Sequence, residues 1–292
     1  MGPRVQNLRP RTPAGSFRAG ASNELLQKNL MSITETVLEM HYHQPLMELF
    51  QSTYGLGAAG KFNFYKYSPQ REVFLGFDQA YAMTELSDAD FFSLLKTSAT
   101  TQNYKLQSRF VAYFLQFKVV SEMQKRSKVT PLPIKSKPHY RSTLDTAKND
   151  NTGFSQHELL YALSKNDGAM VYYACPMLWE KPDLYKAVDL ETLRLVELDS
   201  CPSAFTDHSK HHIYFDQPSA GPIWCSEPVN GRAINPRQMA ERIVAQARQL
   251  SPAESIGQLE KLLSSINARM PDESKGKGLA MVADSLTIVQ LD

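Results

Sequence analysis

The sequence contains few cysteines and no long apolar segment. Only three of its 292 residues are cysteines, and they lie far apart, at positions 175, 201 and 225. An odd number of widely spaced cysteines does not form a disulfide framework and is typical of proteins in the reduced cytoplasm. No apolar run approaches the roughly 18–20 residues that a membrane-spanning helix needs. We therefore expect a cytoplasmic protein with no membrane partner.

A strong excess of charge of either sign is also absent. The 32 Lys and Arg residues nearly balance the 30 Asp and Glu residues, so the net charge is +2. Contact with nucleic acid would therefore have to rest on local basic clusters rather than on the whole surface. Residues 1–22 carry several arginines, and their Pro, Gly and Ser content predicts a disordered basic tail. They lack the continuous apolar core of a secretory signal.

Two motif-like patterns lack the context that their chemistry requires. Residues 55–60 match G-x-G-x-x-G by letter, but a dinucleotide site needs a strand before the glycines and a helix after them, and the predicted order here is the reverse. A second pattern combines cysteines and histidines, which are good Zn²⁺ ligands. Its irregular spacing contains no C-x₂-C pair, which disfavours a structural zinc site at Cys201, His208, His211, His212 and Cys225.

The chain does contain an alternation of helical and strand patterns over residues 23–175. Apolar residues recur at helical spacing after Asn23, and three strand-like segments, a helix and a fourth strand follow. These later segments lie at 61–67, 72–77, 112–119, 154–165 and 169–174. The order predicts an α/β fold with a central mixed sheet of four to five strands flanked by helices. Residues 176–292 are expected to add a C-terminal lobe with two helices.

Polar residues at two of the strands form a candidate catalytic site. Asp78 directly follows the second predicted strand. Gln116 and Lys118 lie two positions apart in the third, so their side chains point to the same face while Phe117 points away. An acid, an amide and an amine are therefore expected to meet at one edge of the sheet.

This combination suits hydrolysis of a phosphodiester bond assisted by a divalent cation. Mg²⁺ prefers hard oxygen ligands, usually one or two carboxylates with water and substrate, and Asp78 and Gln116 would supply oxygen atoms. Lys118 would position the attacking water and offset charge on the phosphate. Glu48, in the helical segment before the strands, would supply an outer carboxylate, with Glu39 as the fallback. The predicted cofactor is therefore Mg²⁺, or Mn²⁺ in its place.

These residues resemble the motifs of a known superfamily, the PD-(D/E)XK nucleases, in the variant whose third motif is Q-x-K. The resemblance covers about residues 24–175 and rests on the order of the motifs and of the elements. It implies a restriction-endonuclease-like fold and a Mg²⁺ site made by Glu48, Asp78, Gln116 and Lys118. Two features depart from the family pattern: Asp78 lacks a preceding proline, and 37 residues separate it from Gln116.

A basic segment follows the predicted catalytic strand directly. Residues 118–148 include eight basic and only two acidic residues. We interpret residues 119–153 as an inserted arm that grips the phosphate backbone of DNA. The predicted contacts are Lys125, Arg126, Lys128, Lys135, Lys137 and Arg141. A solvated loop is the alternative interpretation.

The sequence thus predicts a Mg²⁺-dependent endonuclease that cleaves DNA. Stand-alone proteins of this type resemble effectors of bacterial anti-phage defence, so a partner protein for targeting or activation is expected, and the chain could form a homo-oligomer. The alternative is a catalytically inactive protein of the same fold that binds nucleic acid or protein. Convergence of Asp78, Gln116 and Lys118 within reach of one metal ion would favour the enzyme.

Overall fold

The computed structural model describes residues of one compact unit, 33–292, with gaps. The described positions are 33–53, 62–66, 79–83, 109–111, 113–128, 130–148, 150, 153–166, 169–224, 228–251, several positions between 254 and 268, and 287–289. The predicted basic tail, residues 1–22, lies outside the described residues, as does the predicted strand 72–77.

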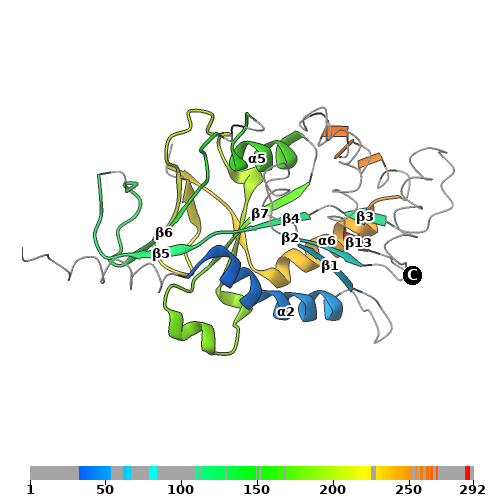
Figure 1. Ribbon diagram of the computed structural model, residues 1–292, viewed down its shortest axis with the longest axis horizontal. Coiled ribbons are helices and arrows are strands. Elements are labelled where there is room, and N and C mark those ends of the chain that lie inside the picture. Colours follow the sequence, from blue (N-terminus) through cyan, green and yellow to red (C-terminus); the bar gives the residue numbers. More distant parts are fainter. Residues whose placement is uncertain are drawn as a thin grey trace, which may run out of the picture. The chain divides into compact units, whose positions relative to one another are not determined.

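The central element is a six-stranded mixed sheet (Figure 1). Its strands, in spatial order, are β1 (Phe62–Lys66), β2 (Gln79–Met83), β4 (Tyr113–Phe117), β7 (Met170–Pro176), β8 (Leu193–Glu197) and β12 (Ala233–Ile234). Strands β4 and β7 pair in parallel, and the other neighbours pair antiparallel. The prediction of an α/β fold with a mixed central sheet is confirmed, although the sheet has six strands rather than four or five.

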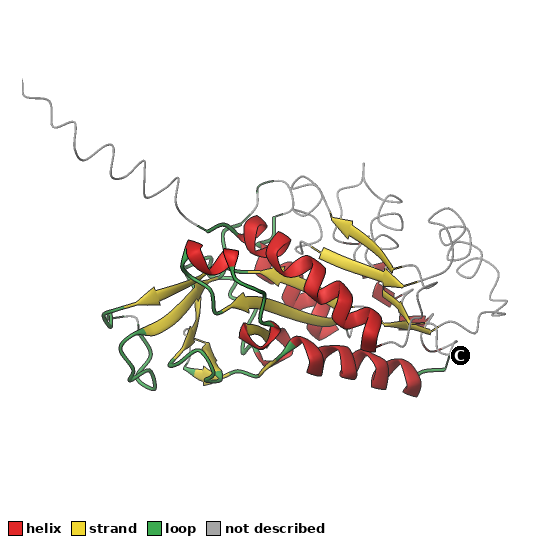
Figure 2. Cartoon of the chain, turned by 90° about the horizontal axis from the view of Figure 1, so that it is seen from below, coloured by secondary structure: helices red, strands yellow, loops and turns green. Residues whose placement is uncertain are grey.

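Strand β4 is buried on both faces, which explains its nearly continuous apolar sequence. One face, with Tyr113 and Phe117, packs in a cluster with α2 (Glu35–Thr53) and α6 (Pro236–Gln249). The opposite face, with Phe114, packs in a cluster with α5 (Gln156–Asn166) and the second sheet. Figure 1 shows the same arrangement, with α2 and α6 on one side of the strands and α5 on the other. Figure 2 shows two long helices side by side in front of the strands.

The second sheet, which the sequence did not predict, has five antiparallel strands. In spatial order they are β11 (Val229–Asn230), β10 (Pro222–Trp224), β9 (His212–Phe215), β6 (His139–Thr143) and β5 (Val120–Met123). Strands β5 and β6 come from the segment predicted to be an inserted arm, so the described loops of this segment are the connection between the two strands and residues 144–148 after β6. The strands are only two to five residues long, and β9 and β10 are buried at every position, so the apolar–polar alternation that identifies strands in a sequence is short or missing.

The described residues after position 176 belong to the same compact unit as those before it, rather than to a lobe of their own. Strands β8 and β12 extend the central sheet, β9, β10 and β11 build the second sheet, and α6 packs on α2. The remaining elements are β3 (Arg109–Val111), which pairs with β13 (Thr287–Val289), and the 3₁₀ helices η1 (Lys181–Tyr185), η2 (Leu190–Thr192) and η3 (Leu198–Ser200). Within the described part of the chain, no helix has the length and apolar character needed to cross a membrane.

Gly231 packs against a buried tryptophan, which makes it sensitive to substitution. Its amide donates to the Pro222 carbonyl at 2.8 Å, and a Cβ atom at this position would come within 2.6 Å of Trp224 Nε1. Because Trp224 is completely buried, making room for the methyl group disturbs the core. We expect Gly231→Ala to lower the free energy of unfolding by about 1–3 kcal/mol in urea denaturation.

The matched control for this substitution is Gly221→Ala. Nothing lies within 4 Å of a Cβ atom added at Gly221, so the change should cost less than about 0.5 kcal/mol. Equal losses of stability in the two variants would contradict the packing argument.

Candidate functional site

Two polar side chains are buried at the end of β4, where the two sheets meet. Gln116 is fully buried and Lys118 is 3% exposed. Lys118 and Val119 connect β4 of the central sheet to β5 of the second, and the Lys118 amide donates to the Ala174 carbonyl of β7 at 2.9 Å. A buried amide or ammonium group is costly unless hydrogen bonds or charges compensate it. The partners of these groups therefore define the site.

Lys118 binds two side chains that come from different helices. Its Nζ lies 2.9 Å from Gln156 Oε1, and 3.2 and 3.4 Å from the two carboxylate oxygens of Glu35. Gln156 Nε2 in turn donates to Gln116 Oε1 at 3.0 Å. Gln156 thus bridges the two β4 residues, and we call Glu35, Gln116, Lys118 and Gln156 the Lys118 cluster.

The first turn of α5 is held in place by its own backbone and side-chain contacts. Ser155 and Glu158 form a capping box, in which the Glu158 amide donates to Ser155 Oγ at 3.1 Å and the Ser155 amide donates to Glu158 Oε2 at 2.6 Å. The His157 amide donates to the Asp145 carbonyl at 3.1 Å. These bonds fix the backbone on both sides of Gln156, so its side chain starts from a defined position.

The acid next to Lys118 is Glu35, whereas the sequence analysis selected Glu48. Both residues belong to α2, but 13 positions separate them, which corresponds to about 20 Å along a helix. Glu48 is exposed and accepts a hydrogen bond from Gln44 at 3.0 Å. The fallback residue, Glu39, is buried on α2. The helix therefore cannot bring Glu35 and Glu48 to the same lysine.

The second predicted metal ligand, Asp78, lies outside the described residues. The next residue in the sequence, Gln79, opens β2 and is the Cα partner of Leu115, which immediately precedes Gln116. The described structure therefore brings Gln116 and Lys118 together as expected and adds Glu35 and Gln156 to them.

The donor atoms of the Lys118 cluster suit a hard cation. Glu35 offers a carboxylate and Gln116 an amide oxygen, and Mg²⁺ is often held by only one or two carboxylates with water and substrate. Among the described residues, no group of three or more His, Cys, Asp or Glu side chains is arranged to hold a metal ion. Glu35 and Gln116 thus offer part of a Mg²⁺ shell, and Asp78, outside the described residues, is the sequence-based candidate for a second carboxylate.

The cysteine and histidine residues considered for zinc have separate partners. His208 Nδ1 lies 3.0 Å from the Thr146 carbonyl, His211 Nε2 lies 2.7 Å from Asp207 Oδ1, and His212 Nδ1 lies 3.2 Å from Thr143 Oγ1. Cys201 is buried and its thiol donates to the Ser203 carbonyl, while Cys225 lies outside the described residues.

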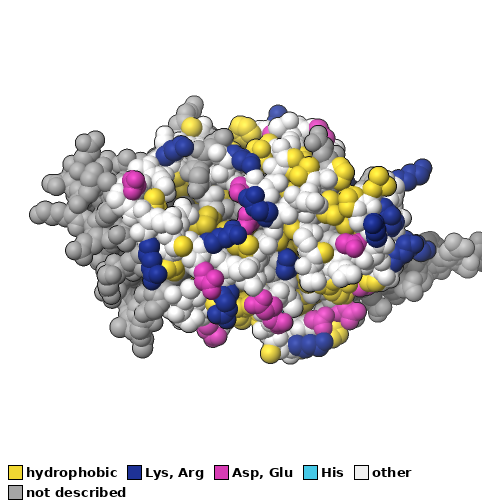
Figure 3. All heavy atoms as spheres, turned by 180° about the vertical axis from the view of Figure 1, so that it is seen from behind, with side chains coloured by type: hydrophobic (Ala, Val, Ile, Leu, Met, Phe, Trp, Pro, Cys, Tyr) yellow, Lys and Arg dark blue, Asp and Glu magenta, His cyan; other side chains and the backbone are white. Residues whose placement is uncertain are grey.

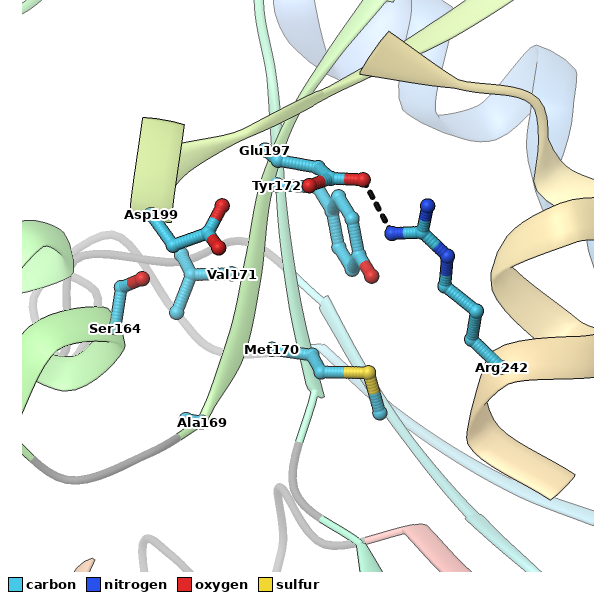
Figure 4. A pocket seen from close by; sticks show the side chains of 8 residues that line it. All are labelled: Ser164, Ala169, Met170, Val171, Tyr172, Glu197, Asp199 and Arg242. Carbon is cyan, nitrogen blue, oxygen red and sulfur yellow. Dashed lines mark hydrogen bonds and ion pairs between the residues drawn. The ribbon is translucent and has the colours of Figure 1, made fainter. Parts of the chain in front are cut away.

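A cavity of about 240 Å³ lies at the other end of β7, away from the Lys118 cluster (Figure 4). Glu197 and Asp199 point into it from one side and Arg242 of α6 from another. Both carboxylates bind arginines: Arg232 lies 2.8 Å from Glu197 Oε2 and 2.5 Å from Asp199 Oδ2, and Arg242 binds Glu197 Oε1. The charged side chains of this cavity thus pair with one another and join β8 to α6. Because these pairs have a structural role, the Lys118 cluster remains the better candidate site.

His157, the residue after Gln156, is buried in its neutral form. Its Nε2 lies 3.1 Å from the Ser203 carbonyl, so this nitrogen donates, and its Nδ1 accepts from the Tyr173 hydroxyl at 2.8 Å. Burial lowers the pKa of His157 to about 4. Burial, with a smaller effect of the nearby Arg141, also lowers the pKa of His212 to about 4.

Comparison with protein-family models, with curated proteins and with solved structures gave no match. The functional assignment of the chain therefore depends on the chemistry of the Lys118 cluster and on the order of the elements around it.

We expect acid to destabilise the folded protein through His157. In the unfolded chain its pKa returns to about 6.5, so between pH 6.5 and about 4 the unfolded state binds a proton that the folded state does not. Stability therefore falls as the pH decreases through this range, by roughly 2–3 kcal/mol for this residue between about pH 7 and about pH 4.5. Urea denaturation at the two pH values measures the loss.

His157→Phe removes the titrating group while keeping an aromatic ring. The variant should lose less stability than the wild type on acidification, whatever its stability at neutral pH. An equally steep pH dependence in the variant would show that His157 is not the group responsible.

Proposed function

We propose that the chain is a Mg²⁺-dependent endonuclease of the PD-(D/E)XK type that cleaves DNA phosphodiester bonds. The observation that carries this proposal is the convergence of a buried lysine, a carboxylate and two amides at the end of β4. The elements α2, β1, β2, β4, α5 and β7 follow one another in this order along the chain, with β3, β5 and β6 between them, and β4 and β7 are parallel. This supports the proposal because the resemblance to the superfamily rests on an order of helix, strands, helix and strand.

Each member of the Lys118 cluster has a chemical role in this proposal. Mg²⁺, when bound, would neutralise charge on the phosphate and lower the pKa of a bound water. Glu35 and Gln116 supply the described oxygen donors that would hold it, together with the sequence-based candidate Asp78. Lys118 directs its positive charge at the phosphate and orients the attacking water. Gln156 holds the side chains of Gln116 and Lys118 in register.

The exposure of the cluster is compatible with access of a substrate from one side. The side chain of Lys118 is only 4% exposed, whereas that of Glu35 is 41% exposed. A phosphate group could therefore approach past Glu35 and meet the lysine in a poorly solvated environment, where electrostatic attraction is stronger than in water.

The loop between β5 and β6, residues 124–138, supports DNA as the substrate. Its exposed cations are Lys125, Arg126, Lys128, Lys135 and Lys137, and the half-buried Arg141 follows on β6. On the face seen in Figure 3, Lys and Arg gather at the right-hand edge, while elsewhere they are mixed with Asp and Glu. A cluster of this kind attracts a phosphate backbone without requiring a basic protein overall.

Hydrogen bonds and packing hold this loop against the second sheet. Asp216 accepts from the Lys135 amide at 2.6 Å, from the Ser136 amide at 2.7 Å and from Ser136 Oγ at 3.0 Å. Ile134 is fully buried and packs with Tyr214 and Ile223. The loop can therefore present its cations in a fixed arrangement, a short distance along the chain from Lys118.

In its biological setting, we propose that the protein is an effector of bacterial anti-phage defence that a partner protein targets or activates. The alternative remains a catalytically inactive protein of the same fold that binds nucleic acid or another protein. The complete set of partners around Lys118 is compatible with this alternative, because a satisfied buried ion pair can serve the fold alone.

Cleavage of supercoiled plasmid DNA in the presence of Mg²⁺ or Mn²⁺ tests the proposed activity. We expect Lys118→Met, Glu35→Gln and Asp78→Asn to reduce the cleavage rate by about 100-fold or more, because each removes a charge that faces the reacting phosphate or its cation. Circular dichroism spectra would show that the variants are folded.

Glu48→Gln is the matched control on the same helix and should cleave at the wild-type rate, since its carboxylate contacts Gln44 at the surface. Full activity in Lys118→Met would remove the site assignment. A wild-type protein that cleaves neither DNA nor RNA with either metal would favour the binding module.

The loop is tested separately by removing its charges. Replacing Lys125, Lys128, Lys135 and Lys137 together with alanine should weaken binding of DNA and reduce the salt dependence of the affinity, by about 0.9 in the logarithmic slope for each phosphate that the loop no longer neutralises. Fluorescence anisotropy over a series of salt concentrations measures both. Lys181→Ala with Lys186→Ala, on η1 and directly after it, is the control; an unchanged slope in the loop variant would exclude the loop from the DNA interface.

A further inference from the structure

Four aromatic rings form a continuous stack that begins at β7. The ring of Tyr173 lies 6.0 Å from that of His157, which lies 4.7 Å from Phe205, which lies 4.0 Å from His211, and neighbouring planes are within 15° of parallel. All four residues are buried. They come from β7, α5 and the segment between η3 and β9, so the stack joins three elements that are separate in the sequence.

His157 is bound at both of its ring nitrogens. Besides the hydrogen bonds to Tyr173 and Ser203, its Nε2 lies 3.8 Å from Cys201 Sγ. Phe205 stacks on the imidazole from a backbone with φ of 51°, a left-handed conformation that L-residues rarely adopt and that costs on the order of 1 kcal/mol. The contacts around Phe205 therefore have to offset the cost of this backbone conformation.

The contacts of the His157 ring add to the bonds of the capping box and the Asp145 carbonyl in holding the first turn of α5. His157 directly follows Gln156, and its partner Tyr173 is the Cα neighbour of Gln116 across the β4–β7 pair. Docking of the imidazole on Tyr173 therefore fixes the start of α5 over the strand position opposite Gln116. At this position Gln156 Oε1 accepts a hydrogen bond from Lys118, and Gln156 Nε2 donates one to Gln116.

We propose that His157 is a positioning residue that acts on the Lys118 cluster through Gln156. The proposal rests on the proposed nuclease function for its kinetic test, but its structural consequence holds whether or not the chain cleaves DNA. A displacement of the first turn by about 1 Å would lengthen both hydrogen bonds of Gln156 beyond a useful distance, and misplacement on this scale is enough to reduce a reaction rate by about 100-fold.

The test combines His157→Phe with Gln156→Ala and the double variant. His157→Phe keeps the stacked ring and loses both hydrogen bonds. We expect each single variant to lower kcat by about 10-fold or more with KM changed less than about twofold. If His157 acts through Gln156, the double variant is no slower than Gln156→Ala alone, whereas independent effects would multiply. Tyr161→Phe, on the same helix, is the matched control and should retain the wild-type kcat.

A second readout does not depend on catalysis. The side-chain amide resonances of Gln116 and Gln156 in ¹⁵N-labelled protein report their hydrogen bonds, and we expect His157→Phe to shift both while Tyr161→Phe leaves them in place. If the wild type cleaves nothing, the proposed function fails and these resonances alone decide the positioning role. Unshifted resonances, or multiplied rate losses in the double variant, would overturn it.

Tyr173→Phe keeps the proposal testable if His157→Phe does not fold. This variant removes only the hydroxyl that donates to His157 Nδ1 and leaves the ring stack and the Ser203 bond intact. We expect it to lower kcat less than His157→Phe does, to shift the same Gln156 resonance, and to add no further loss to Gln156→Ala in the double variant. The absence of all three effects would overturn the proposal.

Discussion

A lysine buried where two sheets meet constrains the structure around it. The effective cost of moving an ammonium group out of water is several kcal/mol, and it is recovered only when an opposite charge and hydrogen bonds surround the group. Glu35 provides the charge and Gln156 an acceptor. Because these residues lie 83 and 38 positions from Lys118 in the sequence, satisfying one side chain ties α2, β4 and α5 together.

The same constraint links the central sheet to the second one. The chain passes from β4 through Lys118 and Val119 into β5, so the cluster lies at the junction and the basic loop between β5 and β6 follows directly. On the opposite side of Gln156, the stack that begins at Tyr173 and His157 anchors α5 to β7. A site for phosphate chemistry at this junction would therefore be held rigidly where Lys118 and Gln156 are buried, and it would be open to solvent at Glu35.

Sequence patterns predicted the central part of the site because it depends on local geometry. Alternation along a strand is enough to place Gln116 and Lys118 on one face, and the apolar run around them indicates a strand covered on both sides. The choice of acid could not be made in this way. Glu35 and Glu48 lie on the same helix, and the pattern of the helix does not say which of its ends meets the strand.

The second sheet was missed for a related reason. Its strands are two to five residues long, and β5 and β6 lie in a segment whose basic and polar residues suggest a loop. Strand β6 pairs with β9, which comes from beyond position 200, and a sequence pattern contains no information about such partners. The prediction of a separate C-terminal lobe missed the same kind of long-range pairing: β8 and β12, which lie after position 176, complete the central sheet instead.

The sequence by itself determined the class of fold, the buried strand and the pairing of an amide with an amine on that strand, since these follow from periodicities of two and 3.6 residues. Only the tertiary structure decided that Glu35 and Gln156 complete the cluster, that the basic segment lies on a second sheet, and that the aromatic stack joins α5 to β7. These features depend on which distant elements meet, and the desolvation of buried polar groups, rather than local propensity, selects those contacts.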